Sequence, residues 1–114
     1  MNLLLVAVED VENIEDFLSV LVEMDVAGVQ VIESSTVMDV LSREAPIFAG
    51  LRELMTRPTA DSKLLVGVTN RDDVPQRFAE LLLRVGLDLD KPGVGYAVCV
   101  PIAGAVGHLD VEGD

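Results

Sequence analysis

The sequence has one cysteine, one histidine, one tyrosine and no tryptophan. Because Cys99 is the only cysteine, an internal disulfide and a cysteine-based zinc site are excluded. A single cysteine also fits a protein of a reducing compartment. His108 lies in a glycine-rich tail near Asp110, where we expect a terminal, non-catalytic residue. Motifs for a serine or cysteine nucleophile, a HExxH zinc site and a Walker loop are all missing. We therefore predict no catalytic residue and no metal ligand.

Basic residues are also scarce. Eight Lys and Arg stand against 20 Asp and Glu, which gives a formal net charge of −12. A field of this sign repels phosphate backbones, so nucleic-acid binding is disfavoured. The N-terminal stretch has no basic region of the kind that opens a signal peptide, so we expect a cytoplasmic protein.

One stretch, Pro92–Leu109, runs 18 residues without Asp, Glu, Lys or Arg. It contains four glycines and two prolines, which favour a strand followed by a turn over a membrane span. Cys99 falls inside that strand between two valines, which indicates a buried and inert thiol.

The chain contains one apolar pattern that occurs twice. Half of its residues are hydrophobic, enough for one core, and we treat residues 1–114 as a single domain. The string Leu4–Val8 returns as Leu64–Val68, an offset of 60. The same offset pairs further apolar positions: Ile14 with Val74, Leu18 with Phe78, Leu21 with Leu81, and Val22 with Leu82.

Two helices follow these strings, at about residues 11–24 and 74–85, with apolar residues at helical spacing on inner faces that include Val22 and Val85. Asp72 or Asp73 is a candidate cap for the second helix, Pro75 suits its first turn, and Gly86 suits its end. A further strand follows each helix, at 27–33 and 95–100.

Strand, helix and strand, repeated, predict an α+β fold: a ferredoxin-like double βαβ with a four-stranded antiparallel sheet and two helices on one face. The strands at 3–8 and 64–68 are apolar throughout, so the helix-free face of the sheet needs a cover as well. For a chain this short we expect that cover to be a second copy, which predicts a homo-oligomer.

An insert at residues 34–61 separates the two halves, and a short acidic tail at 110–114 ends the chain. Ser35 or Thr36 caps a predicted short helix that runs to residue 41 or 42, and Pro46 opens a second helical stretch at 47–55. This second stretch either packs on the domain or recognises a partner. The candidate partner-binding residues are Phe48, Arg52, Met55 and Arg57.

Two segments carry a family resemblance. Met24–Val31 (MDVAGVQV) resembles the turn from the first helix into the second strand of the nitrogen-regulatory PII signalling proteins, and Gly93–Val98 (GVGYAV) resembles the loop before their last strand. The order of elements, with its long insert, is similar to theirs over nearly the whole chain. The resemblance implies a cytoplasmic homotrimer that binds nucleotides or other small effectors in clefts between subunits. It also implies an insert, the family's T-loop, that engages a membrane transporter or an enzyme.

The resemblance and the composition together give a set of candidate ligand-binding residues: Gly28, Ser34, Ser35, Thr36, Lys91, Gly93 and Gly95. Where the family has an acidic residue and a lysine in the last loop, this chain has Val94 and Tyr96, and the basic residues after the last strand have no counterpart. A triphosphate in a site with so few cations binds poorly. We therefore expect ATP and ADP binding to be altered or lost, a less charged effector or a cation to be the alternative ligand, and no certain cofactor.

Other assignments stay open at this stage. The divalent-cation-tolerance proteins and the amino-acid-binding ACT domains have related ferredoxin-like oligomers. A small dimeric α+β barrel enzyme and a purely structural trimer of the metal-tolerance type are the alternative functions.

Overall fold

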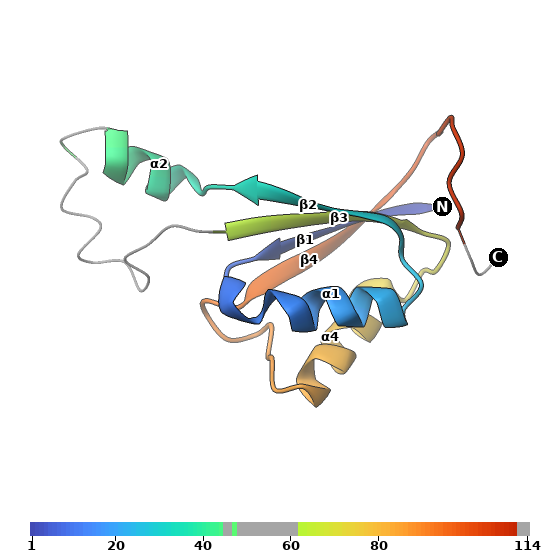
Figure 1. The fold of residues 1–114 in the computed structure, drawn as a ribbon, viewed down its shortest axis with the longest axis horizontal. Coiled ribbons are helices and arrows are strands. Elements are labelled where there is room, and N and C mark those ends of the chain that lie inside the picture. Colours follow the sequence, from blue (N-terminus) through green and yellow to red (C-terminus); the bar gives the residue numbers. More distant parts are fainter. Residues whose placement is uncertain (45–46, 48–61, 112–114) are drawn as a thin grey trace.

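The computed structural model describes residues 1–44, 47 and 62–111. Each strand and helix begins or ends within three residues of its predicted position, and the insert opens with a short helix as expected (Figure 1). The elements in chain order are β1 (Asn2–Val8), η1 (Val11–Asn13), α1 (Ile14–Glu23), β2 (Ala27–Ser34), α2 (Val37–Glu44), β3 (Ser62–Thr69), α4 (Val74–Arg84) and β4 (Gly95–Pro101).

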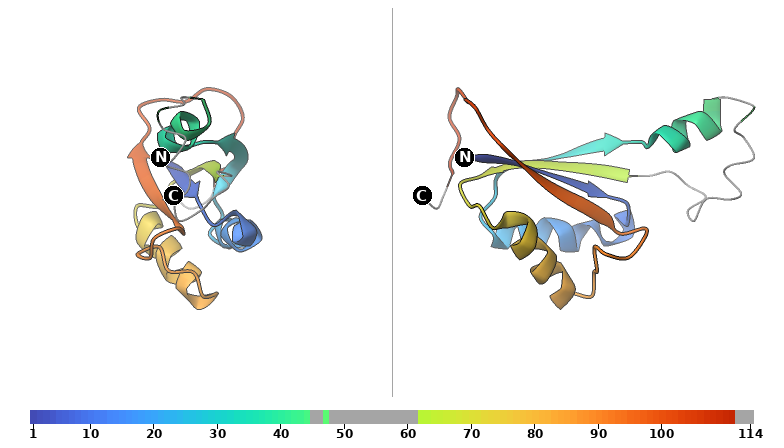
Figure 2. Two further views of the ribbon diagram at one scale, coloured as in Figure 1. Left: turned by 90° about the vertical axis from the view of Figure 1, so that its left-hand side faces the viewer. Right: turned by 180° about the vertical axis from the view of Figure 1, so that it is seen from behind.

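The four strands form one sheet in the order β2-β3-β1-β4, and every neighbouring pair is antiparallel. Helices α1 and α4 lie side by side on one face of it (Figures 1 and 2). This is the ferredoxin-like double βαβ that the sequence predicts. β1 and β3, the two strands of the repeat, are central, whereas β2 and β4 are the edges.

The core lies between the sheet and the two helices. Along β1, Leu4, Val6 and Val8 are buried while the residues between them are partly exposed. Two rings, Phe17 of α1 and Phe78 of α4, meet beneath the sheet with centroids 6.2 Å apart and planes inclined by 47°. Aromatic pairs at this distance and tilt add about 0.5–1.5 kcal/mol to their hydrophobic burial.

The buried positions of the two halves correspond at an offset of 61 residues, not at the offset of 60 that the repeated string suggests. One face of β1 is buried at residues 4, 6 and 8, and the buried face of β3 is at 65, 67 and 69. Because side chains alternate along a strand, an offset of 60 pairs inward residues with outward ones. The helices agree with 61, since these pairs are buried in both halves: Phe17 and Phe78, Val20 and Leu81, Leu21 and Leu82.

This shift also corrects the predicted inner faces of the helices. Val22 is 73% exposed and Val85 is 50% exposed, so neither belongs to the core. Val20, which the predicted inner face left out, is buried instead, and Leu21 takes the place opposite Leu82 that the repeat assigned to Val22. An apolar residue next to the buried stripe also fits the i, i+3, i+4 spacing, which is why the pattern included Val22 and Val85.

Both helices end in the same hydrogen-bonded turn. After α1, the Asp25 N–H donates to Val22 O and the Val26 N–H to Leu21 O; after α4, Gly86 and Leu87 repeat these two bonds. Asp25 and Gly86 both have positive φ, 57° and 86°. These are paired Schellman motifs, in which a residue in the left-handed region satisfies the last carbonyls of the helix. The prediction that Gly86 ends the second helix is confirmed.

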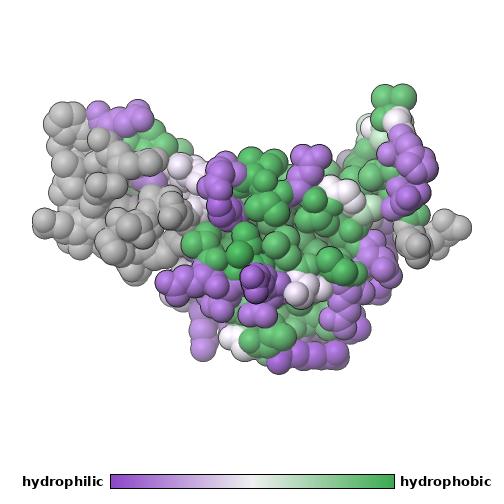
Figure 3. Space-filling model, in the orientation of Figure 1, coloured by the Kyte–Doolittle hydropathy of each residue, from purple (hydrophilic) through white to green (hydrophobic). Residues whose placement is uncertain are grey.

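None of the helices in the described ranges covers the other face of the sheet, which we call the open face. Among the described residues it has no charged side chain. It is turned upward in Figure 3, where the upper outline of the molecule is hollowed between α2 and the C-terminal segment. The strand registers place the following residues on it: Leu3, Leu5, Ala7, Gln30, Ile32, Leu64, Val66, Val68, Tyr96, Val98 and Val100.

The longest helix in the described ranges is α4, with 11 residues, and none there has both the length and the apolar character needed to cross a membrane.

Candidate functional site

Six of the seven candidate ligand-binding residues lie at one end of the sheet, where β1 ends and β4 begins. The strand pairing sets a row of four residues across this end: Glu33, Lys63, Val8 and Gly95. Since neighbouring strands are about 4.8 Å apart, the β2 end and the β4 end of this row are separated by roughly 14 Å. The candidates therefore form two groups, one at each side of the sheet.

The first group belongs to the loop between α4 and β4. The Lys91 N–H donates to Asp88 O at 3.1 Å, and the Asp90 N–H donates to the Asp88 carboxylate at 2.9 Å. Val94 O accepts from both Glu9 N and Asp10 N, at 3.0 and 3.1 Å, and this ties the loop to the turn after β1. The loop is thus a closed turn that docks on its neighbour, and its amides at 90 and 91 are already used.

The two glycines of this loop have separate roles. Gly93 has φ of 84° and open space around it, which suits a turn. Gly95 has φ of 146°, and an added Cβ there would lie 2.2 Å from the carbonyl oxygen of Ala7. A glycine is therefore needed at position 95 so that β4 can approach β1 closely. This packing accounts for the glycine without a bound ligand.

The charges around the loop are mainly negative. Lys91 is exposed and follows Asp88 and Asp90 in the sequence, while Glu9 and Asp10 lie in the turn to which the loop is hydrogen-bonded. An anionic phosphate placed here would meet one cation and several carboxylates. This arrangement favours a neutral or cationic ligand over a nucleotide.

The second group lies where β2 passes into α2. The Ser34 and Ser62 hydroxyls are 3.0 Å apart, and the Ser62 hydroxyl donates to Ser34 O at 2.9 Å. Asp39 N donates to the Thr36 hydroxyl at 3.2 Å, and Thr36 N donates to the Asp39 carboxylate at 3.3 Å. This reciprocal pair is a capping box at the start of α2, so the predicted cap is confirmed. Ser35 lies between these two structural residues.

Gly28 is apart from both groups, at the opposite end of β2. Its φ is 62°, and it falls within a bulge where the β2–β3 register shifts between Ala27 and Gln30. An added Cβ there would lie 3.1 Å from Leu109 of the C-terminal segment. Within one chain the seven candidates therefore do not converge on one site.

The partner-binding candidates Phe48, Arg52, Met55 and Arg57 lie outside the described residues. The described part of the insert contributes a different apolar set, which the sequence reasoning did not single out. Val37, Met38 and Val40 of α2 are all exposed. Because Asp39 interrupts these three residues in the sequence, they do not form the continuous apolar stripe that the sequence analysis looked for.

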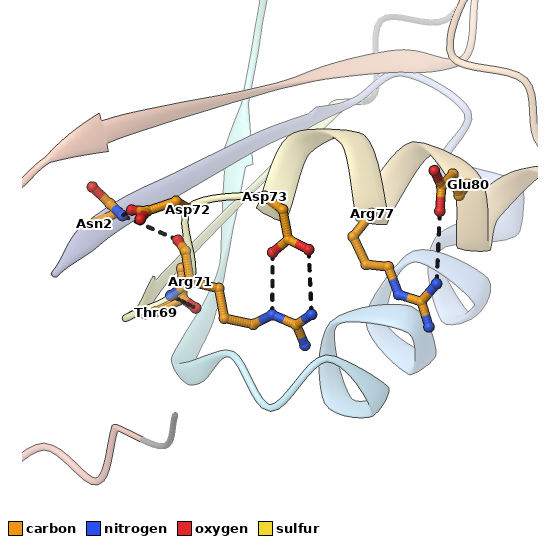
Figure 4. Close-up of polar contacts among 7 residues, drawn as sticks. All are labelled: Asn2, Thr69, Arg71, Asp72, Asp73, Arg77 and Glu80. Atoms are coloured by element: carbon orange, nitrogen blue, oxygen red, sulfur yellow. Dashed lines mark hydrogen bonds and ion pairs between the residues drawn. The ribbon is translucent and has the colours of Figure 1, made fainter. Parts of the chain in front are cut away.

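A polar cluster before α4 also escaped the sequence reasoning (Figure 4). The Arg71 guanidinium contacts both carboxylate oxygens of Asp73, at 3.2 and 3.4 Å, and Asn2 donates to Arg71 O at 3.1 Å. The hydrogen bond from Arg71 lowers the pKa of Asp73 below its usual value. Asp73, one of the two predicted caps, stands at the N-cap position of α4, but its side chain makes no capping hydrogen bond, which corrects that part of the prediction.

The remaining reactive side chains stand apart. Burial raises the pKa of the Cys99 thiol, and the nearby Asp72 carboxylate raises it further, so the thiol stays protonated at neutral pH. Cys99 is only partly buried, where the sequence predicts a buried thiol. His108 is exposed and lies 3.1 Å from the Asp110 carboxylate. Across the described ranges, no three His, Cys, Asp or Glu residues gather as a metal site would require.

Comparison with protein-family models finds none that matches this chain, and comparison with curated proteins likewise finds no match.

Proposed function

We propose that this chain is a non-enzymatic regulatory protein of the PII-like kind, a cytoplasmic homotrimer that senses a small effector in clefts between its subunits. The insert then engages a partner, either a membrane transporter or an enzyme. ATP and ADP are not its effectors, or bind in an altered way.

The observation that carries this proposal is the position of the insert on the double βαβ. The insert leaves the sheet from β2 and returns to β3, and α2 lies beyond the end of the sheet, away from α1 and α4 (Figure 1). Exposed apolar residues on α2 suit contact with another protein. A rigid scaffold that presents an extension of this kind is the usual arrangement for recognition.

The division of the candidate ligand residues supports a site between subunits. One chain holds the Lys91 loop and the Ser34–Thr36 group on opposite sides of its sheet, roughly 14 Å apart. In a ring, the β4 side of one subunit faces the β2 side of the next. Each cleft then contains one group from each of two neighbours.

Calorimetry combined with light scattering tests the proposal. We expect a trimer in solution and no heat of binding with ATP or ADP, because carboxylates surround the loop at Lys91. Lys91→Ala is the matched variant. Tight ATP binding that Lys91→Ala abolishes would mean that the loop is a phosphate site and would overturn the claim of an altered site.

A further inference from the structure

The chain continues past β4 as residues 102–111, a segment without helix or strand that we call the strap. Figure 2 shows that it runs from the end of β4 across to the β2 side of the sheet. At its start, the Ile102 N–H donates to Met1 O at 2.9 Å. Beyond Ile102, no backbone hydrogen bond joins the strap to the described part of the chain. Main-chain hydrogen bonding therefore anchors the strap at its β4 end alone.

The far end of the strap is held by the side chain of Leu109. A Cβ built on Gly28 would lie 3.1 Å from Leu109 Cδ1, so this side chain sits directly against the bare backbone of β2. Leu109 is 37% exposed, whereas the side chains of His108 and Asp110 on either side of it are 88% and 89% exposed. Burial of a leucine side chain is favourable, and here it is what draws the strap onto β2.

The middle of the strap is built to bend. Gly104 and Gly107 lie between the two attached ends, and a Cβ on either would meet nothing within 4 Å. Gly107 has φ of 112°, and Val106 beside it is fully exposed. Glycine has the widest range of backbone conformations, so these two positions can change direction without a steric cost. Neither packing nor a stiff backbone fixes the strap between its ends.

The residue that the strap covers is the candidate ligand residue that lies apart from the other six. Gly28 has φ of 62° and belongs to the bulge that interrupts the pairing of β2 with β3. A bulge leaves a residue unpaired in the ladder, and a glycine there lets another group approach the backbone closely. Leu109 is the group that does so in this structure. A ligand can therefore touch Gly28 only after Leu109 has left.

We propose that the strap is an autoinhibitory lid, anchored at Ile102, hinged at its two glycines and latched by Leu109 on Gly28. Its regulatory role rests on the proposed function, because Gly28 is a ligand residue only in that account. A lid weakens binding by the fraction of time that it is open: a strap open about 1% of the time raises the apparent dissociation constant about 100-fold. The side chain now held against Gly28 is apolar, so the effector that replaces it presents an apolar group at this position.

NMR on the full chain tests the latch with Leu109→Ala. Val106→Ala is the matched control, because it shortens an apolar side chain of the same strap that is fully exposed. Two quantities are measured: the backbone order parameters of residues 103–109, and the broadening of the Gly28 signals by a neutral gadolinium chelate, which reports access from solvent. In the wild type we expect order parameters above about 0.6, outside the flexible range, and little broadening at Gly28.

Leu109→Ala should lower the order parameters of the strap below about 0.6 and increase the broadening at Gly28 severalfold. Val106→Ala should leave both unchanged. A wild-type strap in the flexible range would overturn the lid, because no latch then closes it. A strap that stays ordered in Leu109→Ala would overturn it too, since other contacts then hold the strap, and so would equal effects of the two variants.

The lid and the proposed function can fail separately. The proposed function is judged by the mass of the assembly and by nucleotide binding, and the lid is judged by the order of the strap and the solvent access of Gly28. A mobile strap on a trimer overturns the lid and leaves the regulatory trimer standing. A latched strap on a monomer keeps the contact between Leu109 and Gly28 but overturns its regulatory role together with the proposed function.

Discussion

Asp25 occupies the position that Gly86 occupies in the other half of the molecule, an offset of 61. Both residues end a helix with positive φ, but only glycine adopts that conformation without a steric cost. Aspartate is among the residues that tolerate it best, because its short polar side chain bonds locally. The first half therefore holds a small strain that the second half lacks.

Replacement of Asp25 by glycine is expected to relieve this strain. Asp25→Gly should stabilise the protein by about 0.5–1 kcal/mol in urea unfolding, the usual cost of a left-handed residue that has a side chain, less the added freedom of the unfolded chain. Gly86→Ala is the reverse change at the equivalent position and should destabilise by about 1 kcal/mol. Changes of the same sign in the two variants would show that the two turns are not equivalent.

The Arg71–Asp73 pair sets a second expectation at this scale. Its hydrogen bond lowers the folded-state pKa of Asp73, so any stabilisation by the pair is present at neutral pH and is lost as the pH falls through that lowered pKa. In an NMR titration the Asp73 carboxyl should titrate below the ordinary aspartate value of about 3.9. Arg71→Ala should return it to that value, whereas an unchanged midpoint in the variant would contradict the assigned cause.

At the scale of elements, the sequence predicts all four strands, both core helices and their order. Periodicity and turn residues are local signals, and here they agree with the tertiary fold. The predicted offset between the two halves was wrong by one residue. Because β1 is apolar on both faces, its sequence does not indicate which side chains point into the core. The candidate site was less predictable: Ser34 and Thr36 have structural roles that depend on partners, Ser62 and Asp39, which the sequence pattern did not identify.

The two glycines at the end of the loop between α4 and β4 are needed for different reasons: Gly93 for its backbone conformation and Gly95 also for close packing. Gly93→Ala should cost about 1 kcal/mol of unfolding free energy, because only its backbone conformation is strained. Gly95→Ala should cost roughly 2–5 kcal/mol, because its methyl group would also collide with the Ala7 carbonyl. Thermal or urea unfolding of the two variants checks the order, and a larger loss at Gly93 would contradict it.

At the scale of the whole molecule, the open face and the charge distribution belong together. The chain carries a net charge of −12, yet the described residues place no charge on that face. Like-charged copies repel one another except where a surface is uncharged. Within the described part of the chain, the open face is therefore both suited to join copies and in need of cover.

Two exposed valines make a matched test of that face. Val100→Asp puts a charge on the open face, and Val22→Asp puts the same charge on the outer surface of α1. We expect the first variant to dissociate the assembly, since burying an unpaired carboxylate is costly, and the second to leave the mass unchanged. Equal masses for the two variants would show that the open face is not the contact.

The most direct test of the account is the mass of the wild-type chain in dilute solution, measured by light scattering behind a sizing column. The account predicts three copies of 12.2 kDa, about 37 kDa, unchanged on dilution to micromolar concentration. A stable species of 12.2 kDa would contradict it, because the uncovered face of the sheet would then be in contact with water.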